Sequence, residues 1–386
     1  MVSRHGLTHP TTQWYDVVAM GRPYESTEIR RVWSTRQHTA RRRALWGAHL
    51  HWLTSAGFVH GRRRGSIKEP LHPEHSTVGA LQQEIRRTRR PFLHAGLTSS
   101  DIEDNARLWA CAESVSILVA AAQTAARNII AATACRSRCL GYTHWQPASW
   151  LTWRERGAAW AAPLLSLAGA APQVRTHGFR GANGTGHTQE MLLGRPAPPF
   201  PWEKFGLVQP LAHQIQSSNW VEEARCCAWA GILASHCAKV ALDIRFLCHT
   251  GEMTMSRSPG WVGSSAMPGK RNPIEAERIC GLARLTLDGY ATICAGLANN
   301  GMERTLDSQA PSKEALPRTF GIAHRCLLDT SGLMAAVHID THRCASILRK
   351  HKGAAEAERR VVALVRGGIP PRVAHTQVQA KIEETR

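Results

Sequence analysis

Features that mark several common protein classes are missing from this sequence. Its 11 cysteines are scattered along the chain. No two of them have the CxxC spacing that is typical of zinc sites and redox motifs. We therefore expect buried free thiols rather than a disulfide framework, and neither a metal site nor a cofactor is indicated.

Long apolar segments are also missing. No uninterrupted apolar run reaches the roughly 18 residues that cross a bilayer, and residues 1–10 lack the apolar stretch of a secretory signal. We therefore expect a cytoplasmic protein without a membrane partner.

Acidic residues are few. Asp and Glu number 29 against 48 Lys and Arg, which gives a net charge of +19. Such a field favours anionic partners, either a nucleic acid or an anionic metabolite. The basic residues form short clusters (Arg41–Arg43, Arg62–Arg64, Arg86–Arg90) without the aromatic or glycine pattern of a nucleic-acid module. We therefore expect a solvated basic surface and an anionic small-molecule substrate, and not a nucleic-acid partner.

The sequence shows no strand-like alternation beyond a few residues and no internal repeat. Apolar residues instead recur every three or four positions, which predicts an all-α fold of long antiparallel helices. The predicted helices include Glu28–Trp52, Asp101–Gln146, Val221–Cys248 and Pro273–Leu297, and shorter helices fill residues 313–386. Ser100 and Glu103 have the spacing of a capping box at the start of the predicted helix Asp101–Gln146.

We divide the chain into an N-terminal helical domain (1–97), a central long-helix bundle (98–300) and a shortened C-terminal helical domain (301–386). Long helices in one thin chain bury little surface, so neighbouring subunits are expected to cover their apolar faces. Three chemically distinctive segments, Gly96–Asp101, Tyr142–Ala148 and Gly263–Pro273, lie about 45 and 120 residues apart along the chain. Rigid helices cannot easily bring them to one point within one chain, and we therefore expect a homotetramer.

The most distinctive segment is Gly263–Pro273, which reads GSSAMPGKRNP. It is a loop with small residues, hydroxyls and a cation that leads into a helix. Such a loop can close over an anionic substrate and exclude water. The alternative is that the segment has no catalytic role and only begins a helix at Pro273.

This segment resembles the signature loop of the fumarase/aspartase superfamily. Two further blocks, Gly96–Asp101 and Tyr142–Ala148, stand in the order of that superfamily. Phe179–Gly181, Asp243–Met253 and Glu303–Asp307 resemble its adenylosuccinate lyase branch. The resemblance implies a helix bundle completed by oligomerisation. It also implies a lyase that releases fumarate by β-elimination from adenylosuccinate and from the succinylated imidazole-carboxamide ribotide, in purine biosynthesis.

The resemblance also assigns catalytic roles. Ser264 matches the general base, His144 matches the general acid that protonates the departing nitrogen, and Glu277 matches the carboxylate that orients the histidine. A lone histidine in such a segment would usually be structural, but within a block that resembles the superfamily we expect a catalytic one.

The remaining site residues match substrate-binding positions. Lys270 and Asn272 match the residues that bind the succinyl carboxylates. Arg304 matches the arginine that binds the nucleotide phosphate, and Lys313 keeps one positive charge where the family has an arginine. Thr98 and Ser99 are hydroxyl donors to the substrate or helix caps, and both roles can hold at once. His75 is either a substrate contact or an exposed loop histidine. The other matched positions are Thr143, Gln216 and Tyr24.

Several positions depart from the family pattern at the nucleotide end of the site. They are Pro23, Ser76, His187, Trp220 and Gln309, together with Lys313. These departures leave open two alternatives: a fumarate-releasing lyase for another succinyl-amine of specialised metabolism, or a catalytically silent relative with a basic, nucleic-acid-binding surface.

Overall fold

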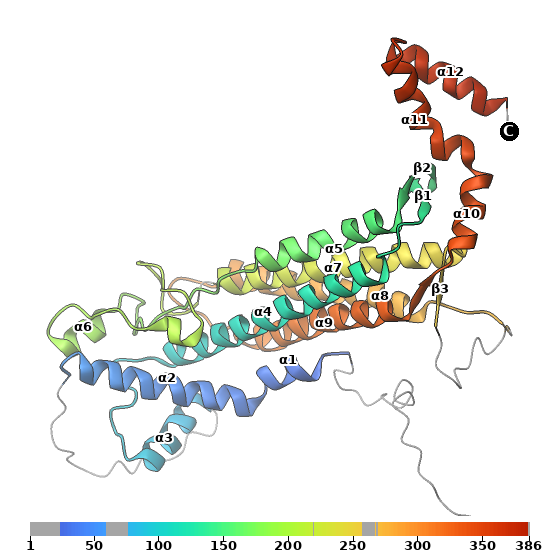
Figure 1. Ribbon diagram of the computed structural model, residues 1–386. Helices are drawn as coiled ribbons and strands as arrows, with labels where there is room; N and C mark the ends of the chain where they lie inside the picture. The colour runs from blue at the N-terminus through green and yellow to red at the C-terminus, as the bar shows by residue number, and fades with distance from the viewer. Residues whose placement is uncertain (1–23, 59–75, 219, 257–266, 268, 385–386) are drawn as a thin grey trace, which may run out of the picture.

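A computed structural model describes residues 24–58, 76–218, 220–256, 267 and 269–384. Five long helices form a rod-shaped bundle (Figure 1): α4 (Ser99–Ala132), α5 (Trp153–Gly169), α7 (Val221–Thr250), α8 (Ile274–Ala298) and α9 (Gln309–Ala336). The chain runs along the rod in one direction in α4, α7 and α9 and returns in α5 and α8. This arrangement confirms the predicted all-α fold with long antiparallel helices at its centre.

Small side chains allow these helices to pack closely. Buried alanines recur on the inner faces of α4 and α7, such as Ala122, Ala126, Ala230 and Ala234. Large apolar residues such as Leu118 and Leu233 fill the remaining space. The resulting core is continuous along the rod, which makes the two ends of the rod fixed positions relative to each other.

The helix predicted for Asp101–Gln146 ends early. After α4 ends at Ala132, the strands β1 (Arg138–Thr143) and β2 (Gln146–Thr152) form an antiparallel hairpin. Gly141 is required there, because a Cβ at this position would lie 2.3 Å from the backbone oxygen of Ser149. The prediction of one continuous helix was wrong because the segment has neither a proline nor a terminating glycine at position 133.

The predicted helix starts were close but not exact. The capping box of α4 is formed by Thr98 and Asp101, and not by Ser100 and Glu103. The helix predicted for Glu28–Trp52 is two helices, α1 (Thr27–Val32) and α2 (Thr35–Ser55). Ser34 separates them because its side chain accepts a hydrogen bond from the backbone of Gln37 and begins a new helix.

The N-terminal helices α1, α2 and α3 (Ser76–Thr88) lie along one side of the rod (Figure 1). The predicted solvated surface is wrong for Arg41, which is buried and paired with Glu113 at 2.5 Å. Arg42 and Arg43 pair with Glu103 and Glu84 at 2.7 and 2.9 Å. This cluster therefore serves the packing of α2 against its neighbours.

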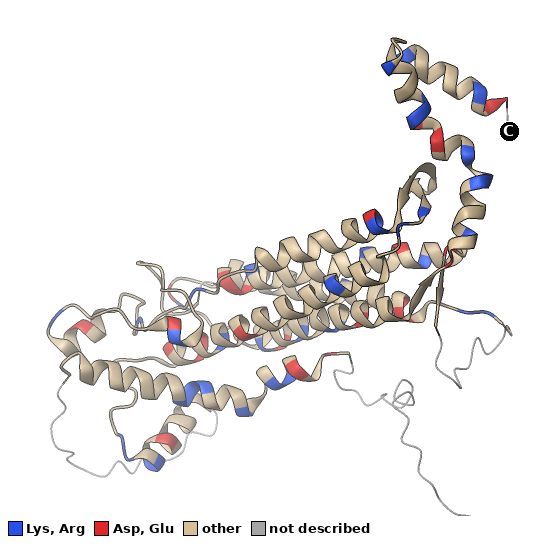
Figure 2. Cartoon of the chain, viewed as in Figure 1, with Lys and Arg blue, Asp and Glu red and all other residues tan. Residues whose placement is uncertain are grey.

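The C-terminal segment leaves the rod as an arm. After α9, strand β4 (Val337–Ile339) pairs with β3 (Met253–Met255), and the chain continues into α10 (Thr341–Lys350), α11 (Lys352–Arg366) and α12 (Pro371–Glu383). The arm holds the hairpin through Trp150, whose ring lies between the guanidinium groups of Arg138 and Arg359. Basic residues occur both on the arm and on the N-terminal helices (Figure 2).

Two shorter helices complete the described chain, α6 (His187–Leu193) and a 3₁₀ helix (Trp202–Phe205). By length and composition alone, α4 and α7 could cross a membrane. Both are central helices of the bundle, which is the usual reason that a helix of a packed protein passes this test. The division into three domains stays a prediction.

Candidate active site

The predicted site residues lie at two opposite ends of the rod. We call one the Thr98 end, where α4, α7 and α9 begin and α8 ends. We call the other the hairpin end, where the β1–β2 hairpin lies, α7 ends and α8 begins. Because α4 has 34 residues, the two ends are about 50 Å apart. One chain therefore does not bring all the predicted residues together.

At the Thr98 end, the start of α4 is fixed by a buried carboxyl group. Asp101 accepts hydrogen bonds from the backbone and side chain of Thr98 at 2.7 and 3.0 Å. It also accepts from the backbone nitrogens of Arg180 at 2.6 Å and Gly181 at 3.2 Å. Burial raises the pKa of Asp101, and these donors oppose that effect. Thr98 is thus a helix cap, and Ser99 beside it is half-buried.

Gln216 and Arg304 meet at the same end. The Gln216 amide donates to the backbone oxygen of Ala182 at 2.7 Å, and its oxygen accepts from Arg304 at 3.4 Å. His177 holds this loop through the backbone oxygen of Gln216 at 2.9 Å. Sequence reasoning missed His177, which carries no motif of its own.

Lys313 and Tyr24 are the remaining predicted binding residues that the structure describes away from the hairpin. Lys313 is exposed near the start of α9, and so it belongs to the Thr98 end. Tyr24 is 47% exposed and precedes α1, whose Ser26 is hydrogen-bonded to His324 in the middle of α9. Tyr24 therefore joins neither end within one chain. His75 lies outside the described residues.

At the hairpin end, Thr143 and His144 are exposed at the tip of the hairpin. Both His144 and Trp145 have left-handed backbone conformations, with φ of 52° and 60°. The predicted general acid therefore lies in a tight two-residue turn, and not on a helix.

Lys270 and Asn272 precede α8 at this end. Lys270 is exposed, Asn272 is half-buried, and Glu277 is exposed in the first turn of the helix. Pro273 is the N-cap residue of α8 and makes no side-chain cap hydrogen bond, and the first turn of a helix favours an anion. Within the described residues no hydrogen bond joins Glu277 to His144. Ser264 lies outside the described residues.

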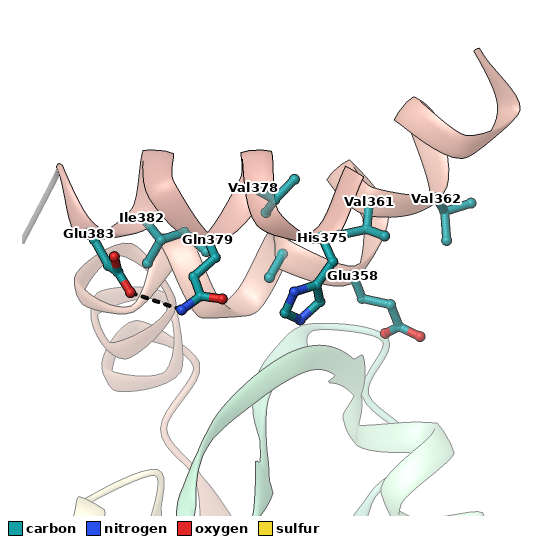
Figure 3. A pocket seen from close by; sticks show the side chains of 9 residues that line it. Glu358, Val361, Val362, His375, Val378, Gln379, Ile382 and Glu383 are labelled. Atoms are coloured by element: carbon teal, nitrogen blue, oxygen red, sulfur yellow. Dashed lines mark hydrogen bonds between the residues drawn. The ribbon is translucent and has the colours of Figure 1, made fainter. Parts of the chain in front are cut away.

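Neither of two hollows in the described part of the chain contains a predicted site residue. One, of about 570 Å³, is an apolar groove between α11 and α12 (Figure 3). The other is lined by residues of α1, α4 and α9, including Glu28 and His324. No group of three or more possible metal ligands occurs among the described residues.

Comparison with solved structures identifies the class to which this fold belongs. The chain superposes on β-carboxy-cis,cis-muconate cycloisomerase from Acinetobacter calcoaceticus with a TM-score of 0.68 and 16% identity, covering 92% of this chain and 86% of that chain. At this identity the likeness shows the fold alone. The family model described as lyase matches residues 72–285, and the chain belongs to this lyase family, in the fumarase/aspartase superfamily.

Among curated relatives the chain is similar to adenylosuccinate lyases. It is 26% identical to the enzyme of Caenorhabditis briggsae over 304 residues, which cover 76% of this chain and 64% of that enzyme. It is also 26% identical to the enzyme of Archaeoglobus fulgidus over 377 residues, which cover 91% of this chain and 83% of that enzyme. The chain thus spans just under two thirds of the first of these relatives.

Proposed function

We propose that the chain releases fumarate by β-elimination from a succinylated amine, with adenylosuccinate and the succinylated imidazole-carboxamide ribotide as substrates in purine biosynthesis. The observation that carries this proposal is the start of α8. There a cation, an amide and the N-terminus of a long helix lie together on a segment that resembles the superfamily signature. A dicarboxylate is the ligand that such a set of donors suits.

The reaction needs a base, an acid and a place for negative charge. In the proposed mechanism Ser264, as an alkoxide, removes a proton from the carbon next to a carboxylate. Lys270, Asn272 and the first turn of α8 stabilise the aci-carboxylate that forms. The carbon–nitrogen bond then breaks as His144 donates a proton to the leaving nitrogen, which gives fumarate and the free amine.

The Thr98 end would hold the other part of the substrate. Arg304 offers a guanidinium group for the phosphate, and the exposed Lys313 offers a second positive charge. Gln216 lies against Arg304 and would contact the same ligand. Ser99 and Thr143 supply hydroxyl groups from the two ends.

Because the ends are about 50 Å apart, both can serve one substrate only if different chains contribute them. We therefore propose a homotetramer in which the Thr98 end of one subunit meets the hairpin end of another. Exposed apolar side chains along the rod support this, since Ile232, Leu242 and Leu287 are 53%, 42% and 52% exposed. Such residues on central helices are typical of a surface covered by another subunit. Tyr24, beside the middle of α9, would reach a site only in the assembly.

A second candidate is the same elimination on a different succinyl-amine. Trp220 stands where the family has an arginine, and its ring is buried and stacks on the guanidinium of Arg107 at 4.3 Å. A side chain in this position is part of the packing and does not face a ligand. The loss of a cationic contact at the Thr98 end favours an amine with fewer negative charges than a nucleotide.

The first test is incubation of the purified protein with adenylosuccinate while fumarate and AMP are measured. We expect Ser264→Ala to lose at least about 10³-fold in turnover while substrate binding largely remains, because the hydroxyl acts on the proton and not on the carboxylates. The neighbouring Ser265→Ala is the matched control and should retain most of the activity.

Normal turnover in Ser264→Ala would refute the assignment of the base. Fumarate release from another succinyl-amine, but not from adenylosuccinate, would favour the second candidate. If neither adenylosuccinate nor any other succinyl-amine releases fumarate, and the protein binds arbitrary DNA in a salt-dependent manner, it is a catalytically silent relative.

A further inference from the structure

The turn that carries His144 has a backbone conformation that its residues disfavour. Thr143 pairs with Gln146, so His144 and Trp145 are the two central residues of the turn, both with positive φ. Turns of this kind favour glycine and asparagine. A side chain with a Cβ costs about 1–2 kcal/mol per residue in this region. Contacts elsewhere must therefore hold the turn in place.

Aromatic contacts with α7 provide part of that support. The rings of Tyr142 and Trp145 both pack on Phe246, each with ring centroids 4.8 Å apart. Phe246 lies in the last turns of α7. Tyr142 and Trp145, which flank His144 in the sequence, thus pack on the same residue of α7. The imidazole of His144 itself has no hydrogen bond within the described residues.

Glu252 provides the polar part of the support. Its side chain is fully buried, and one carboxyl oxygen accepts hydrogen bonds from the Tyr142 hydroxyl and the Thr250 hydroxyl, each at 2.8 Å. The other carboxyl oxygen is buried without a hydrogen-bond partner in the described chain. A buried carboxyl group with a free oxygen is costly to keep, so a role beyond packing is indicated.

Glu252 is itself rigidly held. Its backbone oxygen accepts from the nitrogen of Asp340 at 3.0 Å, and it joins the end of α7 to the β3–β4 pair. Burial and the neighbouring Glu252 raise the pKa of Tyr142, so its hydroxyl keeps its proton and remains a donor. The hydrogen bond from Tyr142 to Glu252 therefore persists over the pH range in which a histidine changes charge.

We propose that Glu252, acting through Tyr142, is a positioning residue that holds the His144 turn in the conformation from which the histidine donates its proton. The inference rests on the proposed role of His144 as general acid. Glu252 does not touch the substrate. It fixes the backbone of the turn that carries His144. Displacement of a catalytic group by about 1 Å can lower the rate about 100-fold.

The test compares Tyr142→Phe, Glu252→Ala and Glu252→Gln in the full-length protein. Tyr142→Phe keeps the ring on Phe246 but removes the hydroxyl, and we expect kcat to fall at least about 10-fold while KM changes less than about 3-fold. Glu252→Ala should have the same effect. Glu252→Gln keeps an acceptor oxygen for Tyr142 and should recover most of the lost kcat.

A readout independent of turnover accompanies the kinetics. Amide hydrogen exchange should become at least about 10-fold faster across residues 138–152 in Tyr142→Phe and Glu252→Ala, and stay near wild type in Glu252→Gln. Exchange in α4 and α8 should not change. Tyr290→Phe removes a tyrosine hydroxyl from α8, far from the hairpin, and is the matched control for both measurements.

The outcomes separate this inference from the proposed function. If His144→Ala is inactive but Tyr142→Phe keeps the wild-type kcat, the inference is wrong and the proposed function stands. If Glu252→Gln is as slow as Glu252→Ala, the hydrogen bond to Tyr142 is not the cause and the inference is also wrong. If His144→Ala turns over normally, the acid assignment fails and the inference fails with it.

Discussion

His49 shows how a single buried residue ties stability to pH. Its ring is fully buried against Trp52 and Phe179, and neither ring nitrogen has a hydrogen-bond partner in the described structure. Burial, and secondarily the nearby His94, lower the pKa of His49 to about 3. Burial also lowers the pKa of His94 to about 4, and its Nδ1 accepts a hydrogen bond from Trp46 that protonation of this nitrogen would break.

These two histidines should make the protein less stable in mild acid. Below pH 6.5 the unfolded chain binds protons at both residues while the folded chain does not, so stability is lost as pH falls. Between pH 7 and pH 5 each histidine should cost about 2 kcal/mol in the free energy of unfolding. Urea unfolding at both pH values measures the loss.

His49→Met isolates one of the two contributions. It removes one titrating group at similar volume, so the difference in stability between pH 7 and pH 5 should shrink by about 2 kcal/mol. An unchanged difference would contradict the neutral, buried state of His49.

At the scale of single residues the sequence suggested candidate binding positions but not the residues that hold them in place. Gln216 and Arg304 were predicted from their neighbours along the chain, and they lie against each other. Glu252 and His177 were not assigned a role. Their importance depends on partners about 110 and 39 residues away, Tyr142 and the Gln216 backbone, which no local pattern reveals.

At the scale of secondary structure, helix periodicity was a good guide to the centre of the rod and a poor one to its end. The predicted Val221–Cys248 and Pro273–Leu297 agree closely with α7 and α8. The hairpin was missed because the arm covers one side of it, with Leu140 packing on Ile347 and Ala355. Strands buried by a distant segment need not alternate clearly in sequence.

Two glycines on α8 provide a test of helix packing. A Cβ at Gly289 would lie 1.8 Å from the hydroxyl of Thr319 on α9, whereas a Cβ at Gly281 would meet nothing within 4 Å. Alanine is favoured over glycine inside a helix by up to about 1 kcal/mol. Gly281→Ala should therefore raise the free energy of unfolding by up to about 1 kcal/mol.

Gly289→Ala should instead lower it by about 1–3 kcal/mol, because the added methyl group forces α8 and α9 apart. Chemical denaturation of both variants gives the comparison. If both were stabilised equally, the close contact of α8 with α9 at this position would be disproved.

At the scale of the whole molecule, the rod separates the residues that the proposed reaction requires. Block order along the sequence gave the resemblance to the superfamily, and block spacing predicted that rigid helices hold the segments apart. The sequence did not indicate which blocks share an end of the continuous core. That separation follows from the length of α4 and from the direction in which α7 and α8 run. The proposed assembly of several subunits is the physical answer to this geometry, since rigid helices cannot bend to close a gap of about 50 Å.

The most direct test of the proposed assembly mixes two variants that we expect to be inactive on their own, one from each end of the rod. His144→Ala removes the proposed acid at the hairpin end, and Gln216→Ala removes a proposed substrate contact at the Thr98 end. After the mixture is dissociated and reassembled, about one quarter of the sites should receive both intact residues from different chains. We predict fumarate release from adenylosuccinate at about one quarter of the wild-type rate. A mixture that assembles but is no more active than its parents, or a wild-type monomer that turns over substrate, would contradict the account.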